Sequence, residues 1–287
     1  MNSETDSPTS KQVLTQTATK ETLLQKLLGQ NYKWFFVIIY NIKFANSGIL
    51  ATFVMGFSQI LETLTTTYLW SMTGATSSTF TYLLLGRIYR TICENNFYNA
   101  LSDDINSGKI TSDLMRPQPL LTFWIFKMIG RRLVRNLVNV SFYILACSIA
   151  ILLFAKVDFN LEKLPILFLM LPISYLIQHF IGNCIGILAF FVDNKRNWYA
   201  CLNTWESLRN VLIGLIIPLD KLPFSGLFQF LPTSFWLHHP MQIYLGKYNA
   251  NQTILVFLSG VFWCILLYFL AKFVFKMGLK KNESVGL

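Results

Sequence analysis

Long apolar stretches alternate with short polar segments along most of this chain of 287 residues. A helix needs about 20 apolar residues to cross the roughly 30 Å hydrocarbon core of a bilayer. Six segments meet this requirement or can be extended to meet it; they are residues 49–72, 77–96, 136–155, 164–192, 199–218 and 253–275. We therefore expect an all-α polytopic membrane protein with six transmembrane helices.

Two of the six segments carry polar side chains. The second contains Arg87, Arg90 and Glu94, and it is retained as a span because the topology fails without it. The fifth is strongly apolar only over residues 211–218, so its helix must begin near residue 199 to be long enough.

The extended fifth helix has an apolar and a polar face. The apolar face is formed by Leu202, Trp205, Leu208 and Leu212, and the polar face by Asn203, Glu206 and Asn210. Because lipid does not tolerate unpartnered polar groups, we expect the polar face to line a path or an interface between chains.

Three further segments are predicted to be helical without crossing the membrane alone. Residues 32–46, bracketed by Lys33 and Lys43, are too short to span and predict an interfacial helix on the inner leaflet. Residues 120–135 predict a helix leading into the third span. Residues 219–246 contain three prolines and several aromatic residues, which predicts a re-entrant segment of short helices between spans five and six.

Composition and charge place this chain in a bilayer. It is 53% hydrophobic and 13% charged, whereas ordinary soluble domains are roughly a quarter charged. The net charge of +10 does not indicate nucleic acid, because its carriers flank apolar runs and form no basic stripe. Residues 1–20 are rich in Ser and Thr and predict a disordered cytoplasmic tail, with residues 21–287 forming one transmembrane domain.

The distribution of basic residues predicts the topology. Eighteen of the 24 Lys and Arg residues lie in the N-terminal tail and flank, in residues 109–135 and 195–209, and at the C-terminal end, whereas four lie in the segments on the other side. Cytoplasmic loops carry the excess of Lys and Arg, so both termini are expected in the cytoplasm.

Residues 99–119 form the longest polar segment after the tail. An acidic pair, Asp103-Asp104, comes before a short amphipathic turn, Gly108 permits a backbone break with φ > 0, and Arg116-Pro117 ends the following helix. Such a charged, non-repetitive loop indicates a docking surface; the alternative is a solvated connector between spans two and three.

Glu62 and Arg87 are predicted to lie at similar depths. Glu62 is about 19 Å above the inner end of span one, and Arg87 is about 14 Å above that of span two. An unpaired charge at that depth is unfavourable, so we expect an ion pair, with Gln59 and Thr66 extending the polar stripe. Alternatively, Arg87 and Arg90 reach toward the cytoplasm with Glu94 as local partner, and Glu62 is protonated or lines a path.

The sequence contains no recognisable catalytic, nucleotide-binding or metal-binding motif. Gly108-Lys109 is followed by Ile110, so there is no phosphate-binding G-x-x-x-x-G-K-[ST] loop. The five cysteines are scattered and are expected to be reduced packing residues, and His238-His239 is more typical of a polar interface than of a metal site.

Two motifs resemble those of a known family. Gly108-Lys109-Ile110 followed by Leu114-Met115-Arg116-Pro117 is similar to a G-x-[IL]…L-[LM]-R-P cytoplasmic motif. The second motif is a set of residues similar in order and spacing to the fifth span and re-entrant segment of the same family. It comprises Gly214, Pro218-Leu219, Pro223, Leu231-Pro232, Pro240 and Gly246. Over residues 31–278 the chain resembles the membrane subunit of ABC exporters of the type-2 superfamily, in a bacterial six-span branch. It departs from that branch in a longer N-terminal tail and in a single Gly278 where a glycine pair is frequent.

The resemblance implies a permease subunit of an ATP-driven exporter in the bacterial plasma (inner) membrane. Two permease chains, identical or homologous, would form the path as a dimer, and two separate ABC ATPase subunits would hold ATP and Mg. The polar loop would couple the two kinds of subunit through Asp103, Asp104, Ile105, Gly108, Lys109 and Arg116. The alternatives are a channel-like or scaffold protein and a membrane-embedded transferase.

Overall fold

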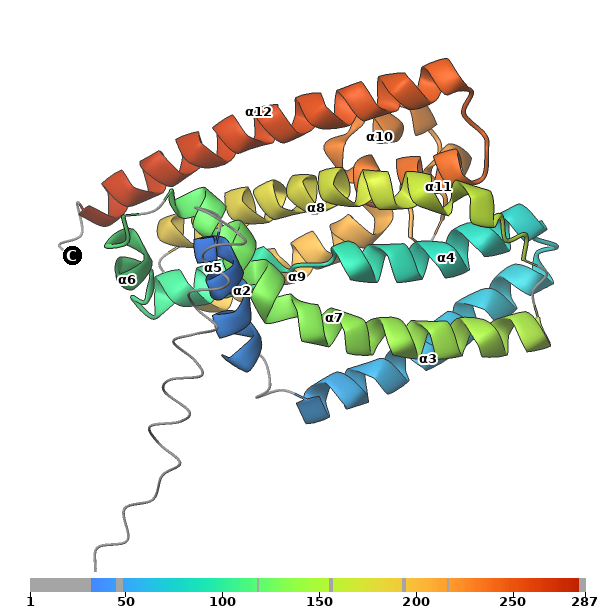
Figure 1. The fold of residues 1–287 in the computed structure, drawn as a ribbon, viewed down its shortest axis with the longest axis horizontal. Coiled ribbons are helices and arrows are strands. Elements are labelled where there is room, and N and C mark those ends of the chain that lie inside the picture. Colours follow the sequence, from blue (N-terminus) through green and yellow to red (C-terminus); the bar gives the residue numbers. More distant parts are fainter. Residues whose placement is uncertain are drawn as a thin grey trace, which may run out of the picture.

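The computed structural model describes residues 32–44, 49–117, 119–154, 157–192, 195–215 and 217–283, and the described part is helical with no β-strand. The longer helices run side by side along the long axis of the molecule (Figure 1). They are α3 (Ile49–Met72), α4 (Ser77–Cys93), α7 (Leu120–Leu153), α8 (Leu164–Ile187), α9 (Lys195–Leu212) and α12 (Ala250–Glu283). The tail expected at residues 1–20 lies outside the described residues.

Three stretches within the described residues are long and apolar enough to cross a membrane; they are Leu120–Leu153, Leu161–Phe191 and Ala250–Lys281. They correspond to the predicted spans three, four and six. The helix predicted for span one begins and ends where expected, at Ile49 and Met72. The chain is thus a multi-pass membrane protein whose described part is all-helical, and a count of six spans stays a prediction.

Helix ends differ from the predicted ones where polar sequence is still helical. Residues 120–135 and the third span form the single 34-residue helix α7, because Arg and Lys are good helix formers and no proline interrupts the stretch. Helix α12 likewise continues past the apolar run to Glu283. The hydrophobic pattern of the sequence indicates which residues lie in lipid, and in both cases the helix extends beyond those residues.

Span five ends earlier than predicted. Helix α9 stops at Leu212, and the chain turns at Gly214, whose φ of +74° places it in the left-handed region that favours glycine. The expected continuous helix to Pro218 is therefore wrong. The second span is also shorter, since α4 ends at Cys93 and Glu94 is already extended.

Short elements gather at the two ends of the long helices (Figure 1). At one end lie α2 (Tyr32–Phe44), α5 (Phe97–Asn106) and α6 (Ile110–Leu114), beside the C-terminal end of α12. The segment expected to re-enter the membrane forms a set of short helices at the other end; they are η5 (Leu219–Lys221), α10 (Ser225–Phe230), η6 (Pro232–Trp236) and α11 (His238–Tyr244). The short 3-10 helices η3 (Leu161–Lys163) and η4 (Leu188–Phe191) flank α8.

Each end has its own hydrophobic core. The larger core joins α4, α8, η6 and α11 through fully buried residues such as Tyr82, Met170 and Met241. The second joins α5, α6, α7 and α8 and includes Leu101, Ile110, Trp124 and Ile187. Helix α2 packs on the same end of α7, where Trp34 stacks on Phe126 with ring centroids 4.9 Å apart. The polar loop thus rests on a packed apolar base.

Candidate functional site

Residues 97–116 fold into two short helices separated by a glycine turn. Helix α5 ends at Asn106, Gly108 has a φ of +72°, and α6 begins at Ile110. Helix α6 ends at Leu114, two residues before Arg116-Pro117. Both breaks expected from the sequence are confirmed, and the buried Leu101 and Ile110 hold the two helices against α7 and α8.

A buried charge cluster fastens this loop to α7. The Lys127 ammonium donates to the carboxylate of Asp104 at 3.1 Å and also to that of Asp113. Trp124 Nε1 donates to Asp113 at 3.2 Å. The side chains of Lys127 and Asp113 are only 10% and 6% exposed, so water screens this pair weakly.

Arg116 belongs to the outer edge of the same cluster. Its Nε lies 3.5 Å from Asp113 Oδ1, and its guanidinium lies 4.6 Å from the centre of the Phe123 ring. Sequence reasoning did not foresee the role of Lys127, because its partners lie 23 and 14 residues earlier in the chain. No local spacing rule predicts such contacts.

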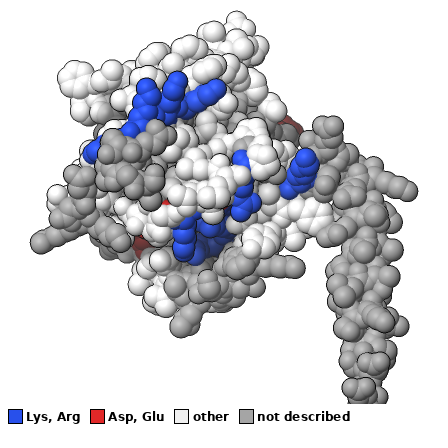
Figure 2. Space-filling view, turned by 90° about the vertical axis from the view of Figure 1, so that its left-hand side faces the viewer, with Lys and Arg blue, Asp and Glu red and all other residues white. Residues whose placement is uncertain are grey.

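The six residues expected to contact an ATPase divide into two groups. Asp103, Gly108, Lys109 and Arg116 are exposed, whereas Asp104 and Ile105 are half-buried and hold the loop in place. Figure 2 views the end of the molecule that carries α2, α6 and the end of α12; several groups of Lys and Arg side chains lie on that face, and few acidic ones are visible. The loop therefore lies at the cationic end of the described structure.

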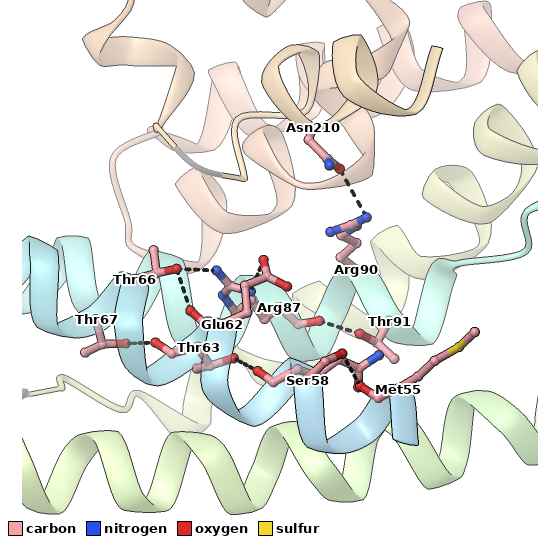
Figure 3. A network of polar contacts seen from close by, with 11 residues as sticks. Met55, Ser58, Glu62, Thr63, Thr66, Thr67, Arg87, Arg90, Thr91 and Asn210 are labelled. Carbon is pink, nitrogen blue, oxygen red and sulfur yellow. Dashed lines mark hydrogen bonds and ion pairs between the residues drawn. The ribbon is translucent and has the colours of Figure 1, made fainter. Parts of the chain in front are cut away.

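A second polar network joins α3 to α4 (Figure 3). Arg87 Nη1 donates to Glu62 Oε1 at 2.9 Å and Nη2 donates to Thr66 at 3.0 Å. The predicted Glu62–Arg87 pair and the contribution of Thr66 are confirmed. Gln59 does not extend the network: its buried amide oxygen has no hydrogen-bond partner among the described residues.

The two members of this pair differ in exposure. The Arg87 side chain is 3% exposed, and that of Glu62 is 56% exposed. Arg90 Nη2 donates to Asn210 of α9 at 3.3 Å. Glu94 lies 3.6 Å from Arg209, also on α9. The network thus connects three predicted spans.

Helix α9 contributes a further set of polar contacts to α5. Tyr98 donates its hydroxyl proton to Glu206 at 2.9 Å, and Arg209 Nη1 donates to Tyr98 at 3.1 Å and to Asn96 at 3.0 Å. Burial raises the pKa of the Tyr98 phenol, so it stays protonated and keeps this donor at neutral pH. Glu206 thus has a partner within the chain and Asn203 is exposed, and the expectation that this face lines a path or an interface between chains stays a prediction.

The predicted faces of α9 need one correction. Leu208, assigned to the apolar face, is 54% exposed, and the neighbouring Arg209 is 6% exposed. Arg209 lies inward because Glu94, Asn96 and Tyr98 all supply acceptors for it. The polar contacts of a buried arginine with several partners stabilise the fold more than the burial of one leucine would.

The histidines and cysteines offer no metal-binding group within the described residues. His239 is held by two hydrogen bonds: its Nε2 donates to the carbonyl oxygen of Gln229 at 2.9 Å, and its Nδ1 accepts from the Tyr248 hydroxyl at 3.0 Å. All five cysteines are free; Cys93 and Cys147 are buried, but Cys201 is exposed and so is not the packing residue that was expected.

The comparison with protein families identifies the chain. A family model described as "ABC-2 family transporter protein" matches residues 47–286, which includes both polar networks and the loop between α4 and α7. No curated protein and no solved structure matched the chain.

Proposed function

The chain belongs to the ABC-2 family of transporter proteins, and from this we propose that it is the permease subunit of an ATP-driven exporter. Two such chains, identical or homologous, form the translocation path, and two separate ATPase subunits bind ATP and Mg. The chain crosses a bacterial inner membrane six times with both termini in the cytoplasm and with residues 219–246 re-entering from outside.

The observation that carries this proposal is the rigid connection between the exposed loop and a long helix. The outer face of α5 and α6 carries exposed charges, and Lys127 and Asp113 join its inner face to α7. Helix α7 continues for 34 residues, about 50 Å at 1.5 Å per residue. A partner that pushes the loop therefore moves a helix that reaches the opposite end of the molecule.

The exposed carboxylate of Glu62 supports a path formed by more than one chain. Residue Glu62 lies near the middle of α3, and its side chain is 56% exposed. A carboxylate facing hydrocarbon is unfavourable even when one oxygen is paired. This side of α3 therefore faces an aqueous path or a second permease chain.

Co-purification tests the proposal directly. The chain, tagged and expressed in its native host, should purify in mild detergent with a stoichiometric ATPase subunit. Reconstituted together, the two should transport a solute only when ATP is hydrolysed. A chain that purifies alone and passes solutes down their gradient in vesicles without ATP would be a channel, which would reject the proposal.

A further inference from the structure

A largely apolar cavity lies between α4, α7 and α8. Its volume is about 450 Å³, which falls in the range of roughly 300–1,000 Å³ found for small-molecule sites. Its walls are formed mainly by aliphatic side chains, including Ile129, Val140, Leu171 and Leu176. At its rim Ile92, Leu133 and Leu137 are exposed, so the cavity opens to an apolar outer surface of the helix bundle.

Besides the Cys93 thiol, three polar side chains line the cavity. They are Arg132, Asn136 and Tyr175. Asn136 donates to the carbonyl oxygen of Glu94 at 2.8 Å, and Tyr175 is 3.5 Å from the carbonyl oxygen of Ile125. Both groups already have an acceptor within the protein.

Arg132 is the exception. Its guanidinium makes no hydrogen bond and no ion pair to any residue in the described part of the chain, although it lies in the field of Glu94. The Glu94 carboxylate lies 3.6 Å from Arg209 instead. Arg135, one helical turn along α7, adds a second positive charge. The α7 side of the cavity therefore carries a positive charge at Arg132, which Glu94 compensates only in part.

The position of the cavity along α7 fits the leaflet on the cationic side of the molecule. Helix α7 runs away from the cationic end of the molecule, so along its side of the cavity Ile125 and Ile129 come first, Arg132 follows and Val140 lies deepest. Arg132 and Val140 are eight residues apart, which corresponds to about 12 Å along the helix. Cytoplasmic leaflets carry anionic lipids that attract Lys and Arg at the membrane surface.

We propose that this cavity binds one acyl chain of an anionic phospholipid of the cytoplasmic leaflet, with the headgroup phosphate at the Arg132 guanidinium. The aliphatic walls accept the chain, and the unpaired guanidinium supplies the donors that a phosphate oxygen needs. The bound lipid fills the space between α4, α7 and α8 and thereby joins the cluster at Glu94 to the long helix. The site is separate from the ATPase contact, and its place in the cytoplasmic leaflet rests on the topology proposed above.

Lipid binding to the purified full-length protein tests the proposal. Native mass spectrometry with phosphatidylglycerol or phosphatidylcholine in neutral detergent should show one lipid retained, with phosphatidylglycerol preferred. Arg132→Gln should weaken phosphatidylglycerol binding by about fivefold, the effect of one basic side chain beside an anionic lipid surface. Arg132→Lys should keep most of the preference. Val140→Trp, which fills the deep end, should reduce retention of both lipids.

Two matched controls separate the cavity from general effects. Arg131→Gln removes the neighbouring charge, which does not line this cavity, and Leu145→Trp enlarges an exposed residue of the same helix; both should bind lipid like the wild type. Equal binding by wild type, Arg132→Gln and Val140→Trp would overturn the proposal. So would selective retention of an uncharged hydrophobic molecule that Arg132→Gln does not affect, or protection of the cavity by a second copy of the chain.

Discussion

Arg87 is buried to 3% exposure in a helix that is expected to lie in hydrocarbon, and two side chains of α3 satisfy it. The guanidinium uses separate nitrogens for Glu62 and Thr66, so the pairing sets both the separation and the rotation of α3 relative to α4. The contact thus fixes the register of α3 against α4. Losing either partner leaves a charge without compensation.

A charge exchange tests the register. Glu62→Arg and Arg87→Glu should each reduce the yield of folded protein, with a cost near the lower end of roughly 3–5 kcal/mol because Glu62 is partly exposed. The double variant should recover a large part of the loss. Thermal unfolding in detergent measures the effect, and Glu62→Arg with Arg90→Glu is the matched control that should not recover. Additive losses in the exchanged pair would show that the contact does not stabilise the fold.

Lys127 should be the most sensitive position at the cationic end. Lys127→Met removes the cation shared by Asp104 and Asp113 and leaves a carboxylate that is 6% exposed without an ion-pair partner on α7. Removing one partner of a buried ion pair costs roughly 3–5 kcal/mol. Thermal unfolding should show that loss, whereas Lys109→Met, at an exposed lysine, should change stability by about 0.5 kcal/mol or less.

A second substitution, made in the Lys127→Met background, tests the same prediction. Asp113→Asn in the Lys127→Met background should restore part of the stability, because the amide needs no counterion and can still accept from Trp124. If Lys127→Met melts like the wild type, the cluster does not fasten the loop.

At the scale of elements, α5 and α6 form a small rigid unit. Ile105 packs against the core beneath α5 and against the cluster that includes Trp198 and Leu202 of α9. The loop therefore contacts α7, α8 and α9 at once. Any displacement of its outer face is distributed to several long helices.

Breaking α5 should uncouple the proposed transporter while leaving it folded. Ile105→Pro removes a backbone donor in the last turn of α5 and clashes with the preceding turn. The ATPase of the assembled complex should then no longer be stimulated by transport. Ile105→Ala, which keeps the helix, is the control for lost packing. A correctly inserted proline variant with normal stimulation would rule out the loop as the coupling element.

At the scale of the whole molecule, charge separates the two ends of the described structure. The end with α2, α6 and the last turn of α12 displays Lys and Arg (Figure 2), whereas the described opposite end has the single ion pair between Lys247 and Asp220 at 3.0 Å. This asymmetry agrees with the topology expected from the sequence, in which the cationic end faces the cytoplasm.

Cysteine labelling tests that topology. In a background with the five native cysteines replaced by alanine, Met115→Cys and Phe159→Cys place thiols at exposed positions at opposite ends of α7. A membrane-impermeant maleimide should label residue 159 in intact cells, and residue 115 only after permeabilisation. Labelling of both from one side would contradict a membrane-spanning α7, and the reverse pattern would invert the topology.

The sequence alone determined that the chain is a helical membrane protein and where several of its helices lie. The ends of α3, the glycine break at Gly108 and the depths of Glu62 and Arg87 all follow from local periodicity, turn chemistry and the fixed rise of a helix. These properties depend on residues close in the chain or on bilayer thickness, so no tertiary information was needed.

Apart from the Glu62–Arg87 pair, only the tertiary structure decided which polar groups meet. Lys127 holds two aspartates from residues 14 and 23 positions earlier, Arg209 lies inward in place of Leu208, and Arg132 is left facing an apolar cavity. Each outcome depends on how helices distant in sequence rotate and pack against one another. A buried charge is stable only where several helices bring it acceptors, and that balance is a property of the assembled bundle.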